Sequence, residues 1–490
     1  MILVIDVGST GLRAAIVDDG GGVDHVEYRP FAPDTPFPGL VEFDAAAMAT
    51  LVLEAANATL ERAGRPTVAG VGIANQRAST IVWDRATGRP IGPALGWQDL
   101  RTVGECLTAK AEHGLALAPN QTATKLQWLL ANSAADRSPA ELCVGTVDTW
   151  VAWTLSEGAV HVTDHTNAGV TGLYSLTEAA WNTHTCELLG IDPSMLPTIV
   201  ASSGTFGEAT ALPGSPPLAA MVGDQQASLV GQGCVEPGMA KVTFGTGGML
   251  DICIGELRPD AERRSTNGTF PIVAWTGAGR TVYGVEAIML SAGTNVEWLV
   301  DDMGLIDTPA ASHDLAATVP DTGGVVYVPA LLGLGTPQWD YGARGMLVGL
   351  TRGSERAHFV RAVLEGVAHR GADLVAAAEA DTSLTIPTLR VDGGMSANPT
   401  FVEALADATA KPVEVSPIVD ATTLGAGFLA GAATEVWSDV ATAAGSWSPR
   451  VVVDPTDRAA PDGDTLTRDR WHEAVRRAGG WIPDLSALDF

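Results

Sequence analysis

The chain has 490 residues, of which 46% are hydrophobic and 18% charged, and its formal net charge is −28 at pH 7. A chain of this length is too long for a single hydrophobic core, so we expect two domains. The strong negative charge argues against binding to nucleic acid or to anionic membranes, because the phosphates of both would be repelled.

The sequence predicts neither a membrane-spanning segment nor a secreted protein. No apolar run reaches the roughly 18 residues that a spanning helix needs. The N-terminus lacks the basic region, apolar stretch and cleavage site of a signal peptide. Scattered cysteines without the paired spacing of a zinc site predict free thiols in a reducing, cytoplasmic environment. These are Cys106, Cys143, Cys186, Cys234 and Cys253.

The N-terminus predicts a β-hairpin whose turn can bind an anion. An apolar, β-branched strand over residues 2–5 is followed by the turn 8–11 and a second strand over 14–17. The N–H and hydroxyl groups of such a turn can surround an anion, and Arg13 adds a positive charge. Asp6 at the strand end suits a hydrated Mg²⁺, which prefers one or two carboxylates plus phosphate oxygens. An ordinary glycine-rich hairpin is an equally weighted alternative.

Helices and strands alternate after this hairpin. We predict a helix over 45–63 and strands over 68–74 and 80–84. The residues between these two strands, 75–79, are Asn-Gln-Arg-Ala-Ser. Polar groups at the end of an apolar strand are typical of a ligand site in an α/β sheet, and a solvated turn is the alternative.

Three further segments of the first half carry polar residues. A helix is predicted over 124–130, a strand-to-helix unit over 144–155 and a polar loop over 163–167. Within this loop we interpret His165 as a hydrogen-bonding residue and not as a catalyst, because no metal-ligand spacing surrounds it.

Asp224 is a candidate catalytic residue. An apolar strand over 218–222 ends in Gly-Asp-Gln-Gln, and a helix is predicted over 227–233. Asp224 would then lie at the carboxyl end of a strand, where α/β proteins bind ligands. An N-cap role is the alternative, since aspartate favours that position, and the two roles can coexist.

The second half repeats the first hairpin. Residues 239–244 predict a strand, 245–248 a Gly-Thr-Gly-Gly turn and 249–254 a second strand. A second copy half a chain later indicates duplicated domains that face each other, each offering a phosphate-contacting turn. Neither turn has the spacing of a P-loop or of a dinucleotide-binding fingerprint.

We therefore predict domains over 1–232 and 233–435, followed by a linker and helix over 436–490. The elements predicted in the second half are a helix over 286–299, a strand and glycine-rich turn over 327–335, a long helix over 358–380, a strand ending in two glycines over 389–395, a helix over 398–409, a small-residue helix over 422–431, a linker over 449–461 and a terminal helix over 465–478.

Several short motifs together make the chain similar to the FGGY family of carbohydrate kinases, up to about residue 435, and within it to the branch that acts on glycerol. The motifs lie at residues 6–10, 75–77, 145–150, 163–167, 223–226, 244–247, 345–350, 358–365 and 391–394. This resemblance implies an α/β fold of two ribonuclease-H-like domains, of the actin and hexokinase type. It also implies that ATP and a small polyol meet in the cleft between them.

The resemblance also implies roles for individual residues. Asp224 matches the catalytic base, and Mg²⁺ would lie near Asp6 and Asp224 through water. The positions that match nucleotide contacts are Ser9, Thr10, Gly11, Arg13, Thr246, Gly293, Glu297, Gly394 and Asn398, with Glu297 replacing a usual glutamine. The positions that match polyol contacts are Arg77, Ala78, Trp97, Asn120, Asp224 and Gln225.

Two of these positions depart from the pattern of the glycerol-specific branch. Ala78 replaces a glutamate and Asn120 replaces a tyrosine, so two groups that fix glycerol hydroxyls are absent. Each lost hydrogen bond should cost roughly 0.5–1.5 kcal/mol. The sequence thus leaves three hypotheses: a glycerol kinase, a kinase for a longer sugar alcohol such as erythritol, and a degenerate sugar-binding protein. It does not decide whether the chain forms a homo-oligomer.

Overall fold

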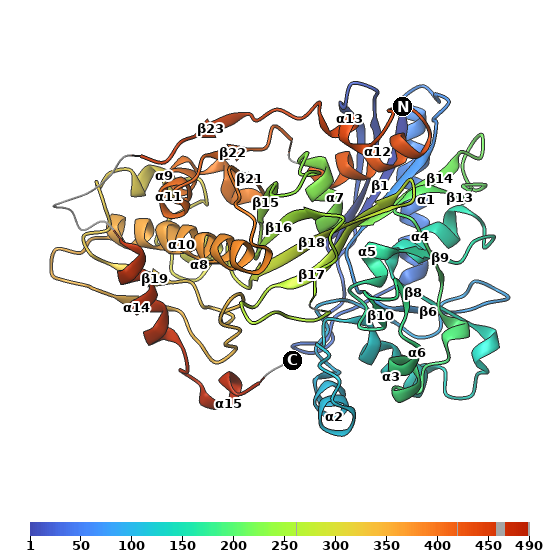
Figure 1. Cartoon of the computed structure of the whole chain (residues 1–490), viewed down its shortest axis with the longest axis horizontal. Helices are drawn as coiled ribbons and strands as arrows, with labels where there is room; N and C mark the ends of the chain where they lie inside the picture. The colour runs from blue at the N-terminus through green and yellow to red at the C-terminus, as the bar shows by residue number, and fades with distance from the viewer. Residues whose placement is uncertain (261, 419, 457–465, 489–490) are drawn as a thin grey trace.

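The computed structural model describes residues 1–490 except 261, 419, 457–465 and 489–490. A 13-stranded sheet runs through the molecule, with helices packed on it (Figure 1). From one edge to the other its strands are β23 (Val451–Val453), β22 (Val413–Val415), β21 (Leu389–Asp392), β15 (Ala240–Phe244), β16 (Gly248–Gly255), β18 (Arg280–Met289), β17 (Phe270–Gly277), β13 (Ser203–Glu208), β14 (Pro217–Gly223), β5 (Val71–Asn75), β1 (Ile2–Val7), β2 (Gly11–Val17) and β3 (Val23–Pro30). Within the described residues, every helix is too short or too polar to cross a membrane.

The predicted N-terminal hairpin is confirmed. Strands β1 and β2 pair antiparallel, with Asp6 opposite Arg13, and β3 extends the sheet on the far side of β2. On its other side β1 pairs parallel with β5, which in turn pairs parallel with β14. Every residue of β1 is buried, as expected for a central strand covered on both faces, and this explains its uninterrupted apolar sequence.

The predicted duplication is also confirmed. In the second half β15 pairs antiparallel with β16, and β16 with β18, while β15 pairs parallel with β21, and β21 with β22. This order repeats that of β1, β2, β3, β5 and β14. The molecule therefore consists of two ribonuclease-H-like halves, and β13 and β17 join their sheets through the pair Ser203 and Gly277.

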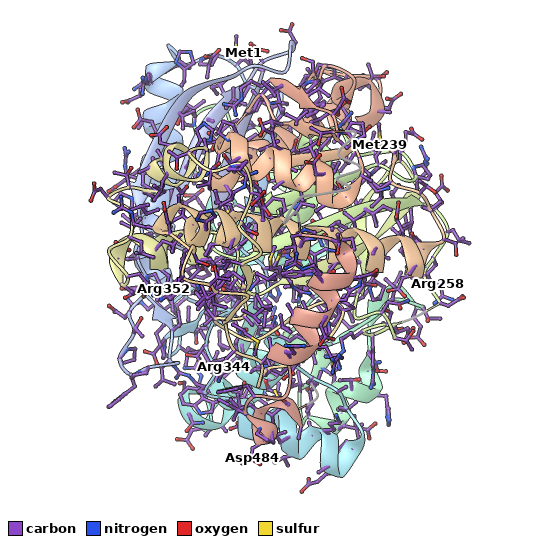
Figure 2. The ribbon with its side chains drawn as sticks, turned by 90° about the vertical axis from the view of Figure 1, so that its left-hand side faces the viewer. Met1, Met239, Arg258, Arg344, Arg352 and Asp484 are labelled. Carbon is purple, nitrogen blue, oxygen red and sulfur yellow. The ribbon has the colours of Figure 1, made fainter. Side chains whose placement is uncertain are left out.

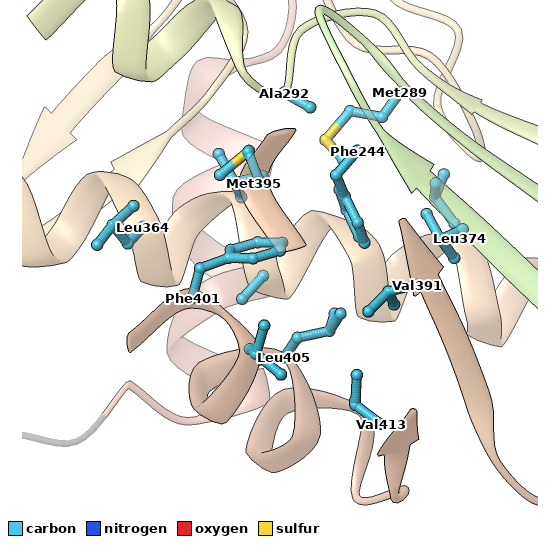
Figure 3. Packing of buried hydrophobic residues seen from close by; sticks show 14 of the residues in the cluster. Phe244, Met289, Ala292, Leu364, Leu374, Val391, Met395, Phe401, Leu405 and Val413 are labelled. Atoms are coloured by element: carbon cyan, nitrogen blue, oxygen red, sulfur yellow. The ribbon is translucent and has the colours of Figure 1, made fainter. Parts of the chain in front are cut away.

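Each half has its own hydrophobic core. In the first, α1 (Ala45–Arg62) and α4 (Val147–Leu155) pack on the sheet, and Trp150 contacts Trp83 at a ring distance of 5.2 Å. In the second, α10 (Arg356–Thr382) and α11 (Pro399–Thr409) pack together. Figure 3 shows Phe244 and Phe401 meeting between these helices, with ring centroids 4.8 Å apart.

Helix α12 (Ala421–Ala433) crosses between the halves. It belongs to the second half in sequence but packs on β1, β5 and β14 of the first half, and Figure 1 places it beside β1. Its main partner is α7 (Asp224–Gly231), against which it packs so closely that Gly231 and Gly425 have no room for a β-carbon. The two helices therefore tie the halves together.

The C-terminal segment packs on the second half. Helix α14 (Arg468–Ala478) buries Trp471, whose Nε1 donates to Asp373 at 3.0 Å, and Arg468 forms an ion pair with the same carboxylate. Farther along, Gly480 donates its N–H to Asp340 at 2.7 Å. Figure 2 shows Met1 and Asp484 at opposite ends of the molecule.

The remaining strands are β4 (Glu42–Phe43), β6 (Ile81–Asp84), β7 (Ala94–Leu95), β8 (Leu142–Gly145), β9 (Val162–Asp164), β10 (Tyr174–Ser175), β11 (Ala180–Trp181), β12 (Thr198–Val200), β19 (Val326–Val328) and β20 (Met346–Val348). The remaining α-helices are α2 (Val103–His113), α3 (Thr122–Ser133), α5 (His165–Ala168), α6 (Thr183–Leu188), α8 (Thr294–Asp301), α9 (Ala311–Ala316), α13 (Val440–Ala444) and α15 (Pro483–Ser486).

Several predicted elements were wrong. The predicted helix over 286–299 is the end of β18 followed by α8, because β18 finds strand partners on both sides, in β16 and β17. The predicted polar loop over 163–167 is the end of β9 and the short α5. The predicted linker contains β23, which pairs with β22, and its residues from 457 onward lie outside the described part of the chain.

Candidate active site

Three parallel strands end at the same place in the first half. Val7 of β1 and Gly223 of β14 are both register partners of Asn75 at the end of β5. The structure therefore brings together the residues around these ends, which include Asp6, Arg77 and Asp224. Burial raises the pKa of Asp6, Arg13 lowers it in part, and the negative charge of the neighbouring Asp224 raises it further.

Asp224 is the first residue of α7 and does not cap it. The N-cap is Gly223, so the alternative N-cap interpretation was wrong, and the helix begins earlier than predicted. The Asp224 carboxylate lies 3.5 Å from Nε of Arg77 and accepts a hydrogen bond from the backbone N–H of Gln225 at 2.8 Å. Burial raises its pKa, and the charge of Arg77 lowers it in part.

Arg77 connects Asp224 to a carboxylate that the sequence did not reveal. Its Nη2 donates to Glu286 at 2.6 Å, and its Nη1 lies 3.4 Å from the amide oxygen of Gln226. Glu286 is on β18 and is 5% exposed, and burial raises its pKa to about 7. Because the sequence placed Glu286 in a helix, its contact with Arg77 was not foreseen.

A second buried ion pair lies behind Gln225. Lys241 and Asp251 are fully buried, with Nζ 2.8 Å from the carboxylate. Lys241 also donates to the amide oxygen of Gln225 at 2.7 Å. Lys241 and Asp251 are charged residues within otherwise apolar strands, and this pattern could have identified them from the sequence.

Trp97 joins the two turns of the first half. Its backbone N–H donates to Ser79 at 3.0 Å, and its indole Nε1 donates to Ser9 at 2.9 Å. Ala78 and Asn120, the two positions that depart from the glycerol-specific pattern, both lie outside helices and strands. Ala78 is buried with a φ of 61°, a conformation that few residues other than glycine adopt. Asn120 is exposed, and its carbonyl accepts from the buried Lys125 at 2.9 Å.

The turn between β1 and β2 is compact. Gly8 donates its N–H to the carbonyl of Gly11 at 2.9 Å, and Thr10 at the tip is exposed. A β-carbon at Gly11 would lie 2.2 Å from the Tyr28 hydroxyl, so a larger residue there would displace that exposed ring. Arg13 lies 3.7 Å from Asp6 and forms an ion pair with Asp420, just before α12.

The candidate nucleotide positions of the second half surround the turn between β15 and β16. Thr246 is exposed, and Gly293 donates its N–H to the carbonyl of Gly245 at 2.8 Å. Glu297 is exposed one turn into α8, and Gly394 has open space around it. Asn398 instead caps α11 by accepting from Phe401, so its side chain already has a structural role.

Other sequence interpretations can also be compared with the structure. His165 is a hydrogen-bonding residue, as predicted, with Nδ1 2.8 Å from the Tyr174 hydroxyl. All five cysteines are free and buried, as predicted for the thiols themselves.

The residues at the strand ends fit Mg²⁺ better than a metal that needs many protein ligands. The described residues contain no group of three or more His, Cys, Asp or Glu side chains suited to a metal. Asp6 is buried, and burial raises its pKa to about 6. Its nearest opposite charge is Arg13, which is shared with Asp420. Two neighbouring, incompletely neutralised carboxylates suit a cation that takes its other ligands from water and phosphate.

The raised pKa of Asp6 predicts a pH-dependent loss of stability. Between its ordinary pKa of 3.8 and its folded value of about 6, the folded chain binds a proton that the unfolded chain has released, so stability falls as pH rises through this window. Above this pH window the ionised Asp6 lowers the free energy of unfolding by about 3 kcal/mol. Without Mg²⁺ and nucleotide, we expect Asp6→Asn to be more stable than the natural chain at pH 8. Its advantage in free energy of unfolding should be smaller at pH 5, and denaturant melts at both pH values measure it. A difference that does not change with pH would contradict this.

Comparisons with known proteins agree with this geometry. The sequence profile of the N-terminal domain of the FGGY family of carbohydrate kinases matches residues 1–231, and that of the C-terminal domain matches residues 240–434. Glycerol kinase from Aromatoleum aromaticum is 41% identical over 98% of this chain and 99% of its own. Glycerol kinase 2 from Thermotoga maritima is 39% identical over the same shares of both chains.

Solved structures give the same result. The crystal structure of Plasmodium falciparum glycerol kinase with ADP has a TM-score of 0.90 at 28% identity, covering 98% of each chain. A xylulose kinase from Brucella ovis has a TM-score of 0.85 at 24% identity over 99% of each chain, which supports the fold alone.

Proposed function

Because the chain belongs to the FGGY family of carbohydrate kinases, we propose that it transfers the γ-phosphoryl group of ATP to a primary hydroxyl of glycerol, giving glycerol 3-phosphate. The observation that carries this proposal is the position of Asp224, beside Arg77 and Asp6 at the ends of three parallel strands. Full-length likeness to glycerol kinases at about 40% identity supports the choice of acceptor.

Asp224 is the general base in this proposal. Its carboxylate accepts the proton of the attacking hydroxyl, which makes the oxygen a better nucleophile toward the γ-phosphorus. Burial raises its pKa from the ordinary value and so increases its basicity. The charge of Arg77, 3.5 Å away, opposes this shift.

The polyol is held by groups around that carboxylate. Arg77 presents N–H donors to the hydroxyl groups, and the ion pair with Glu286 fixes its guanidinium. Gln225 donates through its amide nitrogen, since Lys241 occupies its oxygen. The ring of Trp97, held by its bond to Ser9, forms an apolar wall for the carbon chain.

The two turns hold the phosphates from opposite sides. Ser9, Thr10, Gly11 and Arg13 donate from the first half, and Thr246 donates from the second. Such preorganised donors stabilise the charge on the transferring oxygens. The nucleoside end lies against the second half, at Gly293, Glu297, Gly394 and Asn398. Asp6 and Asp224 would hold Mg²⁺, which neutralises phosphate charge when bound.

Ala78 and Asn120 lower the affinity for glycerol in this proposal without changing the reaction. Neither side chain replaces the hydrogen bonds of a glutamate or a tyrosine, so we expect the KM for glycerol to be high. Longer polyols fill the same space but gain no new partner from these residues.

A panel of acceptors tests the proposal. We expect ATP-dependent ADP release with glycerol at a higher kcat/KM than with erythritol or xylitol, and glycerol 3-phosphate as the product. A coupled assay for ADP and an enzymatic assay for glycerol 3-phosphate measure both. A higher kcat/KM with erythritol would favour the longer substrate, and no turnover of any polyol would contradict a kinase.

A further inference from the structure

A buried polar cluster lies beneath the turns that carry Asp224 and Arg77, and the proposed mechanism does not use it. Its members are 0–1% exposed and come from three segments that are far apart in the sequence. They are Asn75 at the end of β5, Asp164 at the end of β9, Thr166 and Asn167 in α5, and Ser202 just before β13.

Asp164 is the centre of this cluster. It accepts hydrogen bonds from the backbone N–H and the hydroxyl of Thr166, at 3.0 and 2.9 Å. It also accepts from the backbone N–H and the side-chain amide of Asn167, both at 2.9 Å, and from the Ser202 hydroxyl at 2.7 Å. All five contacts are donated to its two oxygens, an arrangement that suits the ionised form. Hydrogen bonds to a charged acceptor are roughly twice as strong as neutral ones.

Thr166 connects this carboxylate to the catalytic turn. Its hydroxyl donates to Asp164, so its lone pair is free to accept, and it accepts the backbone N–H of Gly223 at 2.8 Å. Gly223 directly precedes Asp224. The position of the Asp224 backbone is thus linked to Asp164 through a single hydroxyl.

Asn167 connects the same carboxylate to the polyol-binding turn. The side-chain amides of Asn167 and Asn75 exchange two hydrogen bonds, at 2.8 and 3.1 Å. Asn75 also donates to the carbonyl of Gln76 at 2.8 Å, and Arg77 follows. One buried carboxylate is therefore linked to the turn of Asp224 through Thr166 and to the turn of Arg77 through Asn167 and Asn75.

We propose that Asp164 is a positioning residue, which fixes the turn of Asp224 relative to the turn of Arg77 through Thr166 and Asn167. The inference rests on the proposed function. It assigns to Asp164 the role of holding the catalytic base in the correct position relative to the acceptor-binding turn. Small misplacements of reacting groups reduce rates strongly, by about 100-fold for 1 Å, so this support matters for the rate and not only for folding.

The test compares two equally buried threonines whose hydroxyls have different partners. Thr163 is as buried as Thr166, but its hydroxyl donates to Asp148 at 2.6 Å, away from both turns. We expect Thr166→Val to lower kcat by at least about 30-fold, with an unchanged KM for ATP. Thr166→Ser should retain kcat within about threefold, because it keeps the hydroxyl. Thr163→Val should lower the melting temperature and leave kcat within the same threefold range.

Hydrogen–deuterium exchange of peptides covering residues 217–226 gives a readout besides activity. We expect faster exchange at Gly223 in Thr166→Val, and natural exchange in Thr166→Ser and Thr163→Val. The inference is overturned if Thr166→Val keeps a natural kcat or if Thr163→Val loses as much of it. A natural chain that phosphorylates no polyol would instead contradict the proposed function, and the exchange experiment would still decide whether Thr166 holds the turn.

Discussion

Replacing Asp224 with asparagine is expected to abolish phosphoryl transfer while the fold remains intact. Asparagine has the same shape and can still accept the backbone N–H of Gln225, but it cannot accept a proton at neutral pH. Loss of a general base typically costs 10²–10⁴-fold in rate, and a weakened Mg²⁺ site would add to this. We expect kcat to fall at least about 1,000-fold.

The stability of this variant should not fall. Burial raises the pKa of Asp224, which means that the ionised carboxylate destabilises the folded state, and asparagine removes that charge. Calorimetry should give a melting temperature equal to or above that of the natural chain. Asp44→Asn is a matched control, because Asp44 is an exposed N-cap of α1 and asparagine caps equally well. More than a tenth of natural activity in Asp224→Asn would remove it from the proposed role.

The sequence predicted those parts of the fold that follow from local pattern. The hairpin after residue 1 and its repeat after residue 239 were visible because apolar strands flank glycine-rich turns in both places. The duplicated architecture then followed. Asp6, Arg77 and Asp224 were selected as candidates because polar residues at the ends of apolar runs are typical of ligand sites in α/β sheets.

The parts that failed depend on partners distant in sequence. Glu286 looked helical locally, but pairing of β18 with β16 and β17 outweighs that preference. Its ion pair with Arg77 joins residues 209 positions apart, and no local pattern encodes such a pair. From the sequence, Asp164 was interpreted as part of a polar loop. Its hydrogen bonds with Thr166, Asn167 and Ser202 form only when β9, α5 and the segment before β13 are packed together, so no local pattern indicates them.

The packing of α12 on the opposite half has the same origin. A helix of small residues was predicted, but the sequence does not say which surface requires small residues. In the structure the requirement comes from α7. A β-carbon at Gly425 would lie 1.8 Å from the carbonyl oxygen of Ala227 and 2.8 Å from the backbone nitrogen of Gly231. These are backbone atoms of a helix, so they cannot move aside as a side chain would.

Gly425→Ala is therefore expected to destabilise the protein more than any ordinary glycine-to-alanine change. Alanine gains about 1 kcal/mol in helix propensity, but overpacking costs about 1–3 kcal/mol and more against rigid backbone. With the cost at the upper end of this range, we expect a net loss of about 2 kcal/mol, measured as a lower melting temperature. Because α7 begins with Asp224, moving α7 should also lower kcat.

Gly104→Ala makes the same substitution without the collision and serves as the control. Gly104 lies in α2, and nothing is within 4 Å of its β-carbon position. There the propensity term acts alone, and stability should rise by about 0.5–1 kcal/mol with activity unchanged. If Gly425→Ala instead melts at or above the temperature of the natural chain, the contact between α7 and α12 is not what holds the halves at this distance. The opposite signs expected for the two alanines separate close packing from helix propensity, since only Gly425 faces the backbone of another helix.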